Sequence, residues 1–301
     1  MVYDLIVIGA GPAGITAAVY AARKKMKLLV ITGNIGGQAA WSGDIENYTG
    51  YQFITGPDLA QKFEEHMRTY GISAKEAEEV REIEKREDAI HVRTDKAEYS
   101  SKTVIVASGK TSKELGVPGE KTFKNKGLTY CATCDGPLFS GKSVAVIGGG
   151  NSALDAALQL IKIAKKVYMI NNMPELGGDP VMREKVESSP AAQVLNNAVV
   201  SAITGGAMVD GIKVKRLGRE ESIPVEGVFV EIGLIPNSKF AGILDKNERG
   251  EIKINSRNET NVAGVFAAGD VTDVPEKQII IAAGEGSKAA LGAFKYISRN
   301  R

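Results

Sequence analysis

Short, unbroken apolar runs recur along the chain, and the clearest of them are followed by glycines and then by a longer apolar or amphipathic stretch. Residues 4–9 and 143–147 are two such runs, and 265–270 is a third that ends in an acid. Apolar runs of this length without alternation are typical of strands buried on both faces of a parallel sheet. The pattern therefore predicts an α/β protein in which parallel strands alternate with helices.

The same pattern predicts the order of the elements. Helices are expected over 15–25, 56–70, 153–164 and 278–296, strands over 27–32, 103–107, 166–170 and 228–232, and a small β region over 74–105. Two segments, 115–126 and 233–239, have the composition of linkers or hinges between domains. Because two strand–turn–helix units occur in one chain, we expect two Rossmann-like, three-layer nucleotide-binding domains, the second inserted into the first.

Composition narrows the class of protein without selecting a function. The chain has 301 residues, 43% hydrophobic and 25% charged, and a net charge of +2, which is ordinary for a globular protein of about two domains. No concentrated basic face indicates nucleic-acid binding. The apolar stretch 5–22 has no positive leading segment and is broken by glycines and Pro12, so we expect neither a signal peptide nor a membrane span.

The first glycine-rich turn, residues 9–14, has the spacing GxGxxG between a predicted strand and a predicted helix. There the first glycine permits a tight turn, the second lets backbone approach a pyrophosphate, and the third lets helix and strand pack closely. A turn whose glycines serve packing alone is the alternative. The next strand ends in Thr32-Gly33, without the acid that usually holds an adenosine ribose, so the adenosine must be held differently.

The only two cysteines of the chain form the motif Cys131-Ala132-Thr133-Cys134-Asp135. Such a pair can close a disulfide and reopen it by taking up two electrons, and an adjacent acid can protonate the departing thiolate. Half of a zinc site is the alternative, but the chain offers only His66 and His91 as further histidine ligands, so no metal is expected. Cysteine confined to one CxxC suggests a reducing, cytoplasmic location.

Two further segments have the composition of ligand-binding loops. Asp270 ends an apolar run, at the edge where an open α/β sheet binds its ligand, although helix capping is the alternative. Gly36-Gly37-Gln38 lets backbone approach a ligand and offers amide hydrogen bonds, although an ordinary loop is the alternative.

Five motifs together resemble those of the low-molecular-weight thioredoxin reductases, which are flavoprotein disulfide reductases. The motifs are GAGPAG (9–14), GGQ (36–38), CATCD (131–135), GGGNSA (148–153) and GVFAAGD (264–270), in the family's order over nearly the whole chain. The resemblance implies an FAD-binding domain made of residues 1–112 and 241–301, and an NAD(P)H-domain-like insert, residues 113–240, that carries the CxxC. It also implies a homodimer, domains that rotate about their two connections, and thioredoxin as the substrate.

The resemblance implies a role for each matching residue. Cys134 is the flavin-facing sulfur, Cys131 attacks the substrate disulfide, and Asp135 is the general acid and base. The residues that it implies around FAD are Gly9, Gly11, Pro12, Ala13 and Gly14 at the pyrophosphate turn, Gln38, Asn47, Gln278 and Ile279 by the flavin, the backbone of Val80 near the adenine, Asp270 on the ribityl hydroxyls, and Gly37, Ala107, Gly109 and Gly269 in the same site.

The chain departs from the NADPH-dependent members of that family after the strand 166–170. Those members carry a His-Arg-Arg stretch there, whereas this chain has Asn171-Asn172. Asparagine cannot pair with a phosphate dianion as arginine does, and no acid ends the strand to bind a bare ribose. We therefore predict ferredoxin as the electron donor, as in some relatives. Lysines that could meet an acidic ferredoxin are Lys121, Lys124, Lys126, Lys162, Lys165 and Lys166, although a solvated face also explains them.

Three alternatives stay open. The first is a reductase that binds NADH or NADPH at an atypical site built on Asn171 and Asn172. The second is a ferredoxin–NADP reductase of related fold, which the CxxC disfavours because that reaction needs no dithiol. The third is a non-catalytic flavin sensor whose CxxC responds to redox state.

Overall fold

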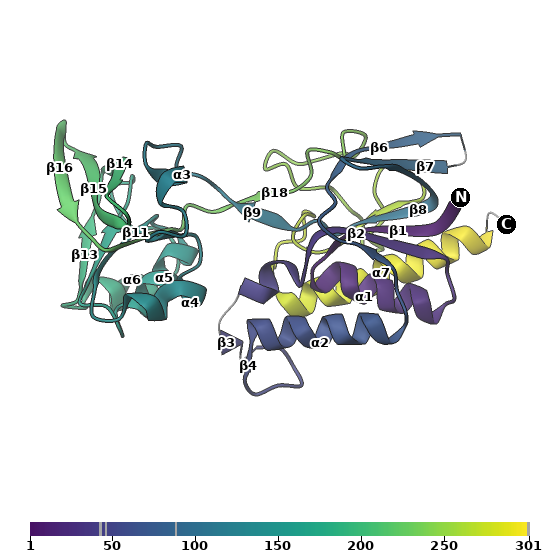
Figure 1. Cartoon of the computed structure of the whole chain (residues 1–301), viewed down its shortest axis with the longest axis horizontal. Coiled ribbons are helices and arrows are strands. Elements are labelled where there is room, and N and C mark those ends of the chain that lie inside the picture. Colours follow the sequence, from purple (N-terminus) through teal and green to yellow (C-terminus); the bar gives the residue numbers. More distant parts are fainter. Residues whose placement is uncertain (42–43, 46, 88, 300–301) are drawn as a thin grey trace. The chain divides into compact units, whose positions relative to one another are not determined.

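The structure, a computed structural model, describes residues 1–41, 44–45, 47–87 and 89–299, with only the backbone of Trp41, Asp44, Thr133 and Cys134. The chain forms two units (Figure 1). One consists of Met1–Thr111 and Ile235–Arg301, and the other of Ser112–Leu234. The inserted arrangement predicted from the sequence is therefore present.

The first unit is a sheet with helices on one face. Its elements are β1 (Val2–Ala10), α1 (Pro12–Arg23), β2 (Leu28–Ile35), a 3₁₀ helix (Gly37–Trp41), β3 (Asp44–Ile45), β4 (Ile54–Thr55), α2 (Gly56–Thr69), β5 (Ala74–Lys75), β6 (Val80–Arg86), β7 (Ala89–Thr94), β8 (Glu98–Val106), β19 (Val265–Ala267) and α7 (Ile279–Arg299). Two short paired strands, β9 (Lys110–Ser112) and β18 (Leu234–Pro236), cross the boundary between the two units. The main sheet has the order β5-β2-β1-β8-β7-β6, with β19 paired to β8.

Both faces of this sheet are buried, as the unbroken apolar runs predict. Leu5 and Val7 of β1 face the α1 and α7 layer, while Ile6 and Ile8 face the β6–β7 hairpin and the segment before β19. Figure 1 shows α1, α2 and α7 on one side of the strands β1 and β2, and the β6–β7 end of the sheet on the other. Gly286 allows α7 to cross α1 closely, since a Cβ there would lie 2.0 Å from the carbonyl oxygen of Ala13.

The second unit repeats this layering. Its elements are α3 (Glu120–Phe123), β10 (Leu128–Thr129), α4 (Ala132–Asp135), a 3₁₀ helix (Gly136–Phe139), β11 (Ser143–Ile147), α5 (Asn151–Leu160), β12 (Lys166–Ile170), α6 (Pro180–Glu187), β13 (Ala192–Leu195), β14 (Ala198–Gly205), β15 (Val209–Arg216), β16 (Arg219–Pro224) and β17 (Gly227–Val230). A parallel sheet, β10-β17-β11-β12-β13, lies between the α4–α6 layer and the antiparallel β14–β16 sheet.

Two expectations about the connections need correction. Segment 115–126 is not a linker, because it contains α3 and the carboxylate of Glu120, only 2% exposed, accepts the backbone N–H groups of Leu115 and Gly116 at 2.7 Å. The predicted boundary at residue 240 also lies too far along. Asn237 already belongs to the first unit, since its side chain donates to the carbonyl of Ser108 at 2.9 Å.

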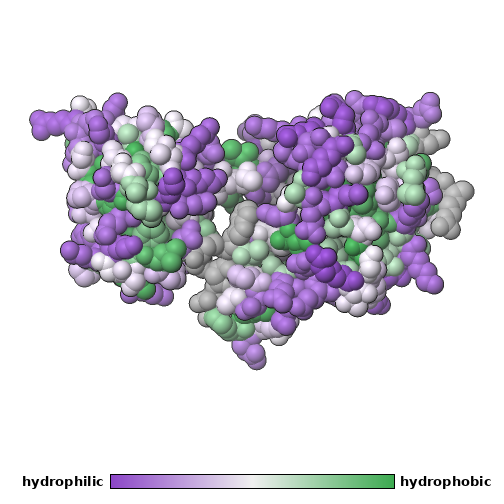
Figure 2. Space-filling view, viewed as in Figure 1, coloured by the Kyte–Doolittle hydropathy of each residue, from purple (hydrophilic) through white to green (hydrophobic). Residues whose placement is uncertain are grey.

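The face of the molecule drawn in Figure 2 carries many polar residues. Hydrophilic residues cover most of each unit on the face drawn in Figure 2. Within the described ranges, no helix is both long enough and apolar enough to cross a membrane.

Candidate active site

The predicted pyrophosphate turn lies where the carboxyl ends of neighbouring parallel strands meet. Gly9 has a φ of +102°, and a Cβ there would lie 2.4 Å from the carbonyl oxygen of Ala107, just after β8. A Cβ at Gly14 would lie 1.9 Å from the carbonyl oxygen of Gly9. Two of the three motif glycines are therefore required by close backbone contacts, and Ala107 lies beside them as predicted.

The middle glycine instead borders open space. A Cβ at Gly11 would meet only the Cα of Gly37, at 3.9 Å. A Cβ at Gly269, which has a φ of +77°, would lie 3.0 Å from the Cβ of Ala13. Segments 9–14, 36–38, 107–109 and 264–270, far apart in the sequence, thus converge, with room left above Gly11 for a phosphate to approach the backbone.

Asp270 lies in a charged cluster at this edge. Burial raises the pKa of Asp270, and the charges of Lys277 and Lys110 oppose that rise. Both lysines pair with Glu251, with Nζ–Oε1 distances of 2.8 Å for Lys110 and 3.3 Å for Lys277. Gln38 donates from Nε2 to the carbonyl of Lys110 at 3.0 Å. Two of the predicted site residues therefore interact with Lys110: Gln38 with its backbone carbonyl and Asp270 with its charge.

The other predicted FAD contacts fall into separate groups. Asn47 donates from Nδ2 to Oε1 of Gln278 at 3.1 Å, which brings two predicted flavin neighbours together. Ile279 packs against a small cluster that contains Ile45 and Leu59. Val80 begins β6 and lies in the core beside β2. Their contact with a flavin or an adenine, like that of Gly109 and Pro12, stays a prediction.

The CxxC motif lies at α4, in the second unit. Cys131 is disulfide-bonded and partly exposed, and Cys134 is the only other cysteine in the sequence. The side chain of Cys134, predicted to face the flavin, lies outside the described residues. The Thr129 hydroxyl accepts the Cys131 backbone N–H at 3.2 Å and donates to Asp135 Oδ2. Thr129 therefore links the predicted acid to the backbone of Cys131, a role that no pattern in the sequence indicates.

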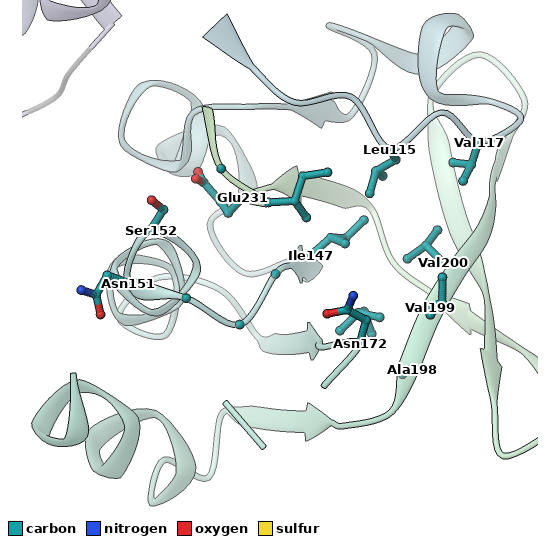
Figure 3. A pocket seen from close by; sticks show the side chains of 16 residues that line it. Leu115, Val117, Ile147, Asn151, Ser152, Asn172, Ala198, Val199, Val200 and Glu231 are labelled. Atoms are coloured by element: carbon teal, nitrogen blue, oxygen red, sulfur yellow. The ribbon is translucent and has the colours of Figure 1, made fainter. Parts of the chain in front are cut away.

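A cavity of about 560 Å³ opens at the second glycine turn (Figure 3). Residues 148–152, Asn172 and residues 231–233, which directly follow β17, line it, and the described residues around it include no Lys, Arg or His. Figure 3 shows Glu231 and Ser152 on one side and Asn172 beside Val200 on the other. This volume is in the usual range for small-molecule sites.

Asn171 and Asn172 differ in what they can offer to a ligand. The Asn171 side chain is buried, and its Nδ2 donates to the carbonyls of Met173 and Glu175 and to Oδ1 of Asn196, at 2.8–3.2 Å. It is therefore a structural residue, and a site built on both asparagines is excluded. Asn172 alone is exposed to the cavity.

The comparisons with known proteins agree with this geometry. Residues 3–286 match the family described as pyridine nucleotide-disulphide oxidoreductases. The chain belongs to this family. An "NADH dehydrogenase" of Ferdinandcohnia aciditolerans is 45% identical over 99% of this chain and 58% of its own length. One of the subunits of an alkyl hydroperoxide reductase, from Staphylococcus epidermidis, is 41% identical over 99% and 60%. The chain thus spans about three-fifths of the length of these relatives.

Several solved structures of the family cover the chain almost end to end. A thioredoxin reductase of Lactococcus lactis is 33% identical with a TM-score of 0.87, and one of T. acidophilum is 39% identical with 0.84, each over 99% of both chains. A ferredoxin-flavin thioredoxin reductase of Clostridium acetobutylicum, 30% identical over 99% of this chain and 98% of its own, has a TM-score of 0.54. This pyridine nucleotide-disulphide oxidoreductase therefore has the two-domain fold of the low-molecular-weight thioredoxin reductases.

FAD is the cofactor of this family, and the first unit fits it. The open space at Gly11 suits a pyrophosphate, and the carboxyl group of Asp270 suits ribityl hydroxyls. When bound, FAD supplies a carrier that accepts and delivers two electrons.

Asp270→Ala is expected to weaken FAD binding by about tenfold to a hundredfold, because about 1.5–3 kcal/mol of charge-assisted hydrogen bonding is lost. Equilibrium dialysis of the apoprotein against FAD measures the change. Asp273→Ala is the control, since that carboxylate instead accepts the backbone N–H of Ile254 at 3.2 Å. Equal affinities of the two variants for FAD would show that Asp270 does not bind the cofactor.

Proposed function

We propose that this flavoprotein reduces protein disulfides, with the Cys131–Cys134 pair passing electrons from FAD to a thioredoxin-type disulfide. The observation that carries the proposal is the redox segment itself: a partly exposed, disulfide-bonded Cys131 whose backbone shares Thr129 with the acid Asp135. A packing disulfide needs no such acid. Neighbours of matching length that are named thioredoxin reductases support the choice of acceptor.

The residues of α4 supply the sulfur chemistry. After the pair is reduced, the Cys131 thiolate attacks one sulfur of the acceptor disulfide and forms a mixed disulfide, and the second cysteine resolves it. Asp135 gives a proton to the departing thiolate and takes one back in the next cycle. Thr129 holds Asp135 in reach of that step, while the partial exposure of Cys131 admits a protein substrate.

We propose NADH as the electron donor, in place of the ferredoxin predicted from the sequence. The formed cavity at residues 148–152 supports a dinucleotide, and the absence of a cation from its described lining disfavours a 2′-phosphate. Arg183, the nearest arginine along the chain, pairs instead with Glu175 at 3.2 Å. The relative named NADH dehydrogenase supports the same choice. The homodimer and the cytoplasmic location stay predictions.

Asn172→Arg is expected to raise turnover with NADPH, relative to NADH, by about tenfold or more, because a guanidinium at the cavity edge can pair with the 2′-phosphate. Steady-state kcat/KM for both nucleotides measures the ratio. Lys162→Arg is the matched control, since it keeps a cation at an exposed position of the same unit. If Asn172→Arg left the NADPH/NADH ratio of kcat/KM unchanged, the nucleotide would not bind beside Asn172.

An anaerobic comparison of donors tests the function. Flavin bleaching and thioredoxin reduction are followed with NADH, NADPH and reduced ferredoxin, and NADH is expected to be the fastest. If only ferredoxin reduced the flavin, the NADH proposal would be overturned and the ferredoxin donor predicted from the sequence would be supported. Failure to reduce any protein disulfide, even with chemically reduced flavin, would favour the redox-sensor alternative.

A further inference from the structure

Glu231 is a largely buried acid that the steps above leave without a role. It directly follows β17 and lies at the wall of the cavity, on the side of Ser152 (Figure 3). Its carboxylate accepts a hydrogen bond from the backbone N–H of Ala132, the residue after Cys131. Glu231 therefore touches the backbone of the redox segment and the nucleotide-type cavity at once.

The surroundings of Glu231 favour its protonated form. Burial raises the pKa of Glu231 to about 7, the Ala132 amide opposes the rise, and the negative charge of Asp155 on α5 adds to it. The other charged groups on adjoining segments are Asp135 on α4 and the exposed side chains of Lys113 and Glu114. The backbone N–H of Lys113 donates to the carbonyl of Gly233 at 2.9 Å. In the part of the chain that the structure describes, Glu231 forms no ion pair.

Reduction of the neighbouring disulfide changes the charge beside this acid. Two electrons break the S–S bond, and near neutral pH one sulfur takes a proton while the other can remain a thiolate. Glu231 contacts the backbone directly after Cys131, and a new negative charge on this segment raises the pKa of a buried carboxyl further, because the effective dielectric constant inside a protein is low. The ionised form of Glu231 is thus more favourable when the disulfide is closed than when it is reduced.

We propose that Glu231 is a positioning residue that stores a proton: it binds one from solvent when Cys131–Cys134 is reduced and releases it when the disulfide re-forms. The overall change is then two electrons and two protons, one on a sulfur and one on Glu231. The electrons come from reduced flavin in the proposed function, or from any dithiol. The proton on Glu231 compensates the negative charge of the thiolate, so the net charge beside the cavity stays nearly constant through the cycle.

A redox titration of the disulfide tests whether Glu231 binds a proton on reduction, and it needs neither flavin turnover nor an acceptor protein. The wild type, Glu231→Gln and Glu226→Gln are each equilibrated with reduced and oxidised dithiothreitol from about pH 6 to about pH 9. Free thiols are then counted by maleimide mass shift. Glu226, an exposed glutamate just before β17, is the matched control.

The ratio of the reduction equilibrium constants, wild type over Glu231→Gln, is expected to fall by about tenfold or more across that range, about 30 mV per tenfold. Below the pKa of Glu231 in the oxidised state the acid is protonated in both states, so the ratio is flat there. The ratio of wild type to Glu226→Gln should not change with pH. A flat ratio for Glu231→Gln would overturn the proposal, even if thioredoxin reduction were established.

Infrared difference spectroscopy on the wild type covers the case in which Glu231→Gln does not fold. Dithiothreitol reduction near pH 8 should produce the C=O stretch of a protonated, buried carboxyl group. Asp155→Asn removes a like charge and should move that signal to lower pH. Absence of the signal from the wild type between about pH 7 and about pH 9 would also overturn the proposal.

Discussion

Replacing Cys131 by serine is expected to abolish the reduction of protein disulfides, by about a thousandfold or more, and to leave FAD bound and reducible by the donor. A serine hydroxyl is not ionised near neutral pH and cannot attack a disulfide sulfur to form a mixed disulfide. Turnover of a thioredoxin disulfide, compared with reduction of an artificial dye by the same protein, measures the effect.

The dye reaction is the internal control, because it takes electrons directly from the flavin and needs no dithiol. Ser140→Ala, an exposed position shortly after α4, is the matched variant and should keep both activities. A Cys131→Ser protein that still reduced thioredoxin would show that another route delivers the electrons.

Glu251→Gln is expected to destabilise the first unit by about 3 kcal/mol at neutral pH, because it leaves two largely buried lysines unpaired. Burial alone would raise the pKa of Glu251, but hydrogen bonds from Lys110 and Asn247 and the two lysine charges outweigh it and lower that pKa to about 2. The depressed pKa means that the stabilisation is present above the unfolded value of 4.5 and is lost as pH falls. Urea unfolding measures the difference.

The chain supplies a close control for this substitution. Glu259 ends a similar loop, where Asn255 donates to its carboxylate at 2.7 Å as Asn247 does to Glu251. Among the residues that the structure describes, however, the one ion pair of Glu259 is with the exposed Arg257. Glu259→Gln should therefore cost less than about 1 kcal/mol. Between pH 4.5 and pH 3 the gap between the wild type and Glu251→Gln should shrink by about 2 kcal/mol. A gap independent of pH would contradict the ion-pair explanation.

Much of the fold follows from the sequence because its strongest signals are local. The strands at 143–147 and 166–170 have the predicted bounds, since after a polar first residue each is an apolar run with core residues on both faces. The GxGxxG turn was predictable because its spacing is local: Gly14 is required by a contact within the strand–turn–helix unit itself, whereas Gly9 is required by the backbone just after β8, its neighbour in the sheet.

The failures come from contacts between residues distant in the sequence. Segment 115–126 has the composition of a linker, but Tyr130 donates to the buried carboxylate of Glu120 at 2.8 Å and holds the segment in the second unit. Glu231 was only one more residue of a predicted strand, because its contact with Ala132 spans almost the whole unit. Asn171 was mistaken for a ligand residue because its hydrogen-bond partner Asn196 lies on a later loop.

The most direct test of the electron route is an anaerobic titration with dithionite, followed by flavin absorbance. A flavin takes up two electrons, and a disulfide in redox contact with it takes up two more. The wild type is expected to consume twice as many electrons per FAD as Cys131→Ser does. Equal consumption by the two proteins would mean that the disulfide exchanges no electrons with the flavin, and the proposed route would be wrong.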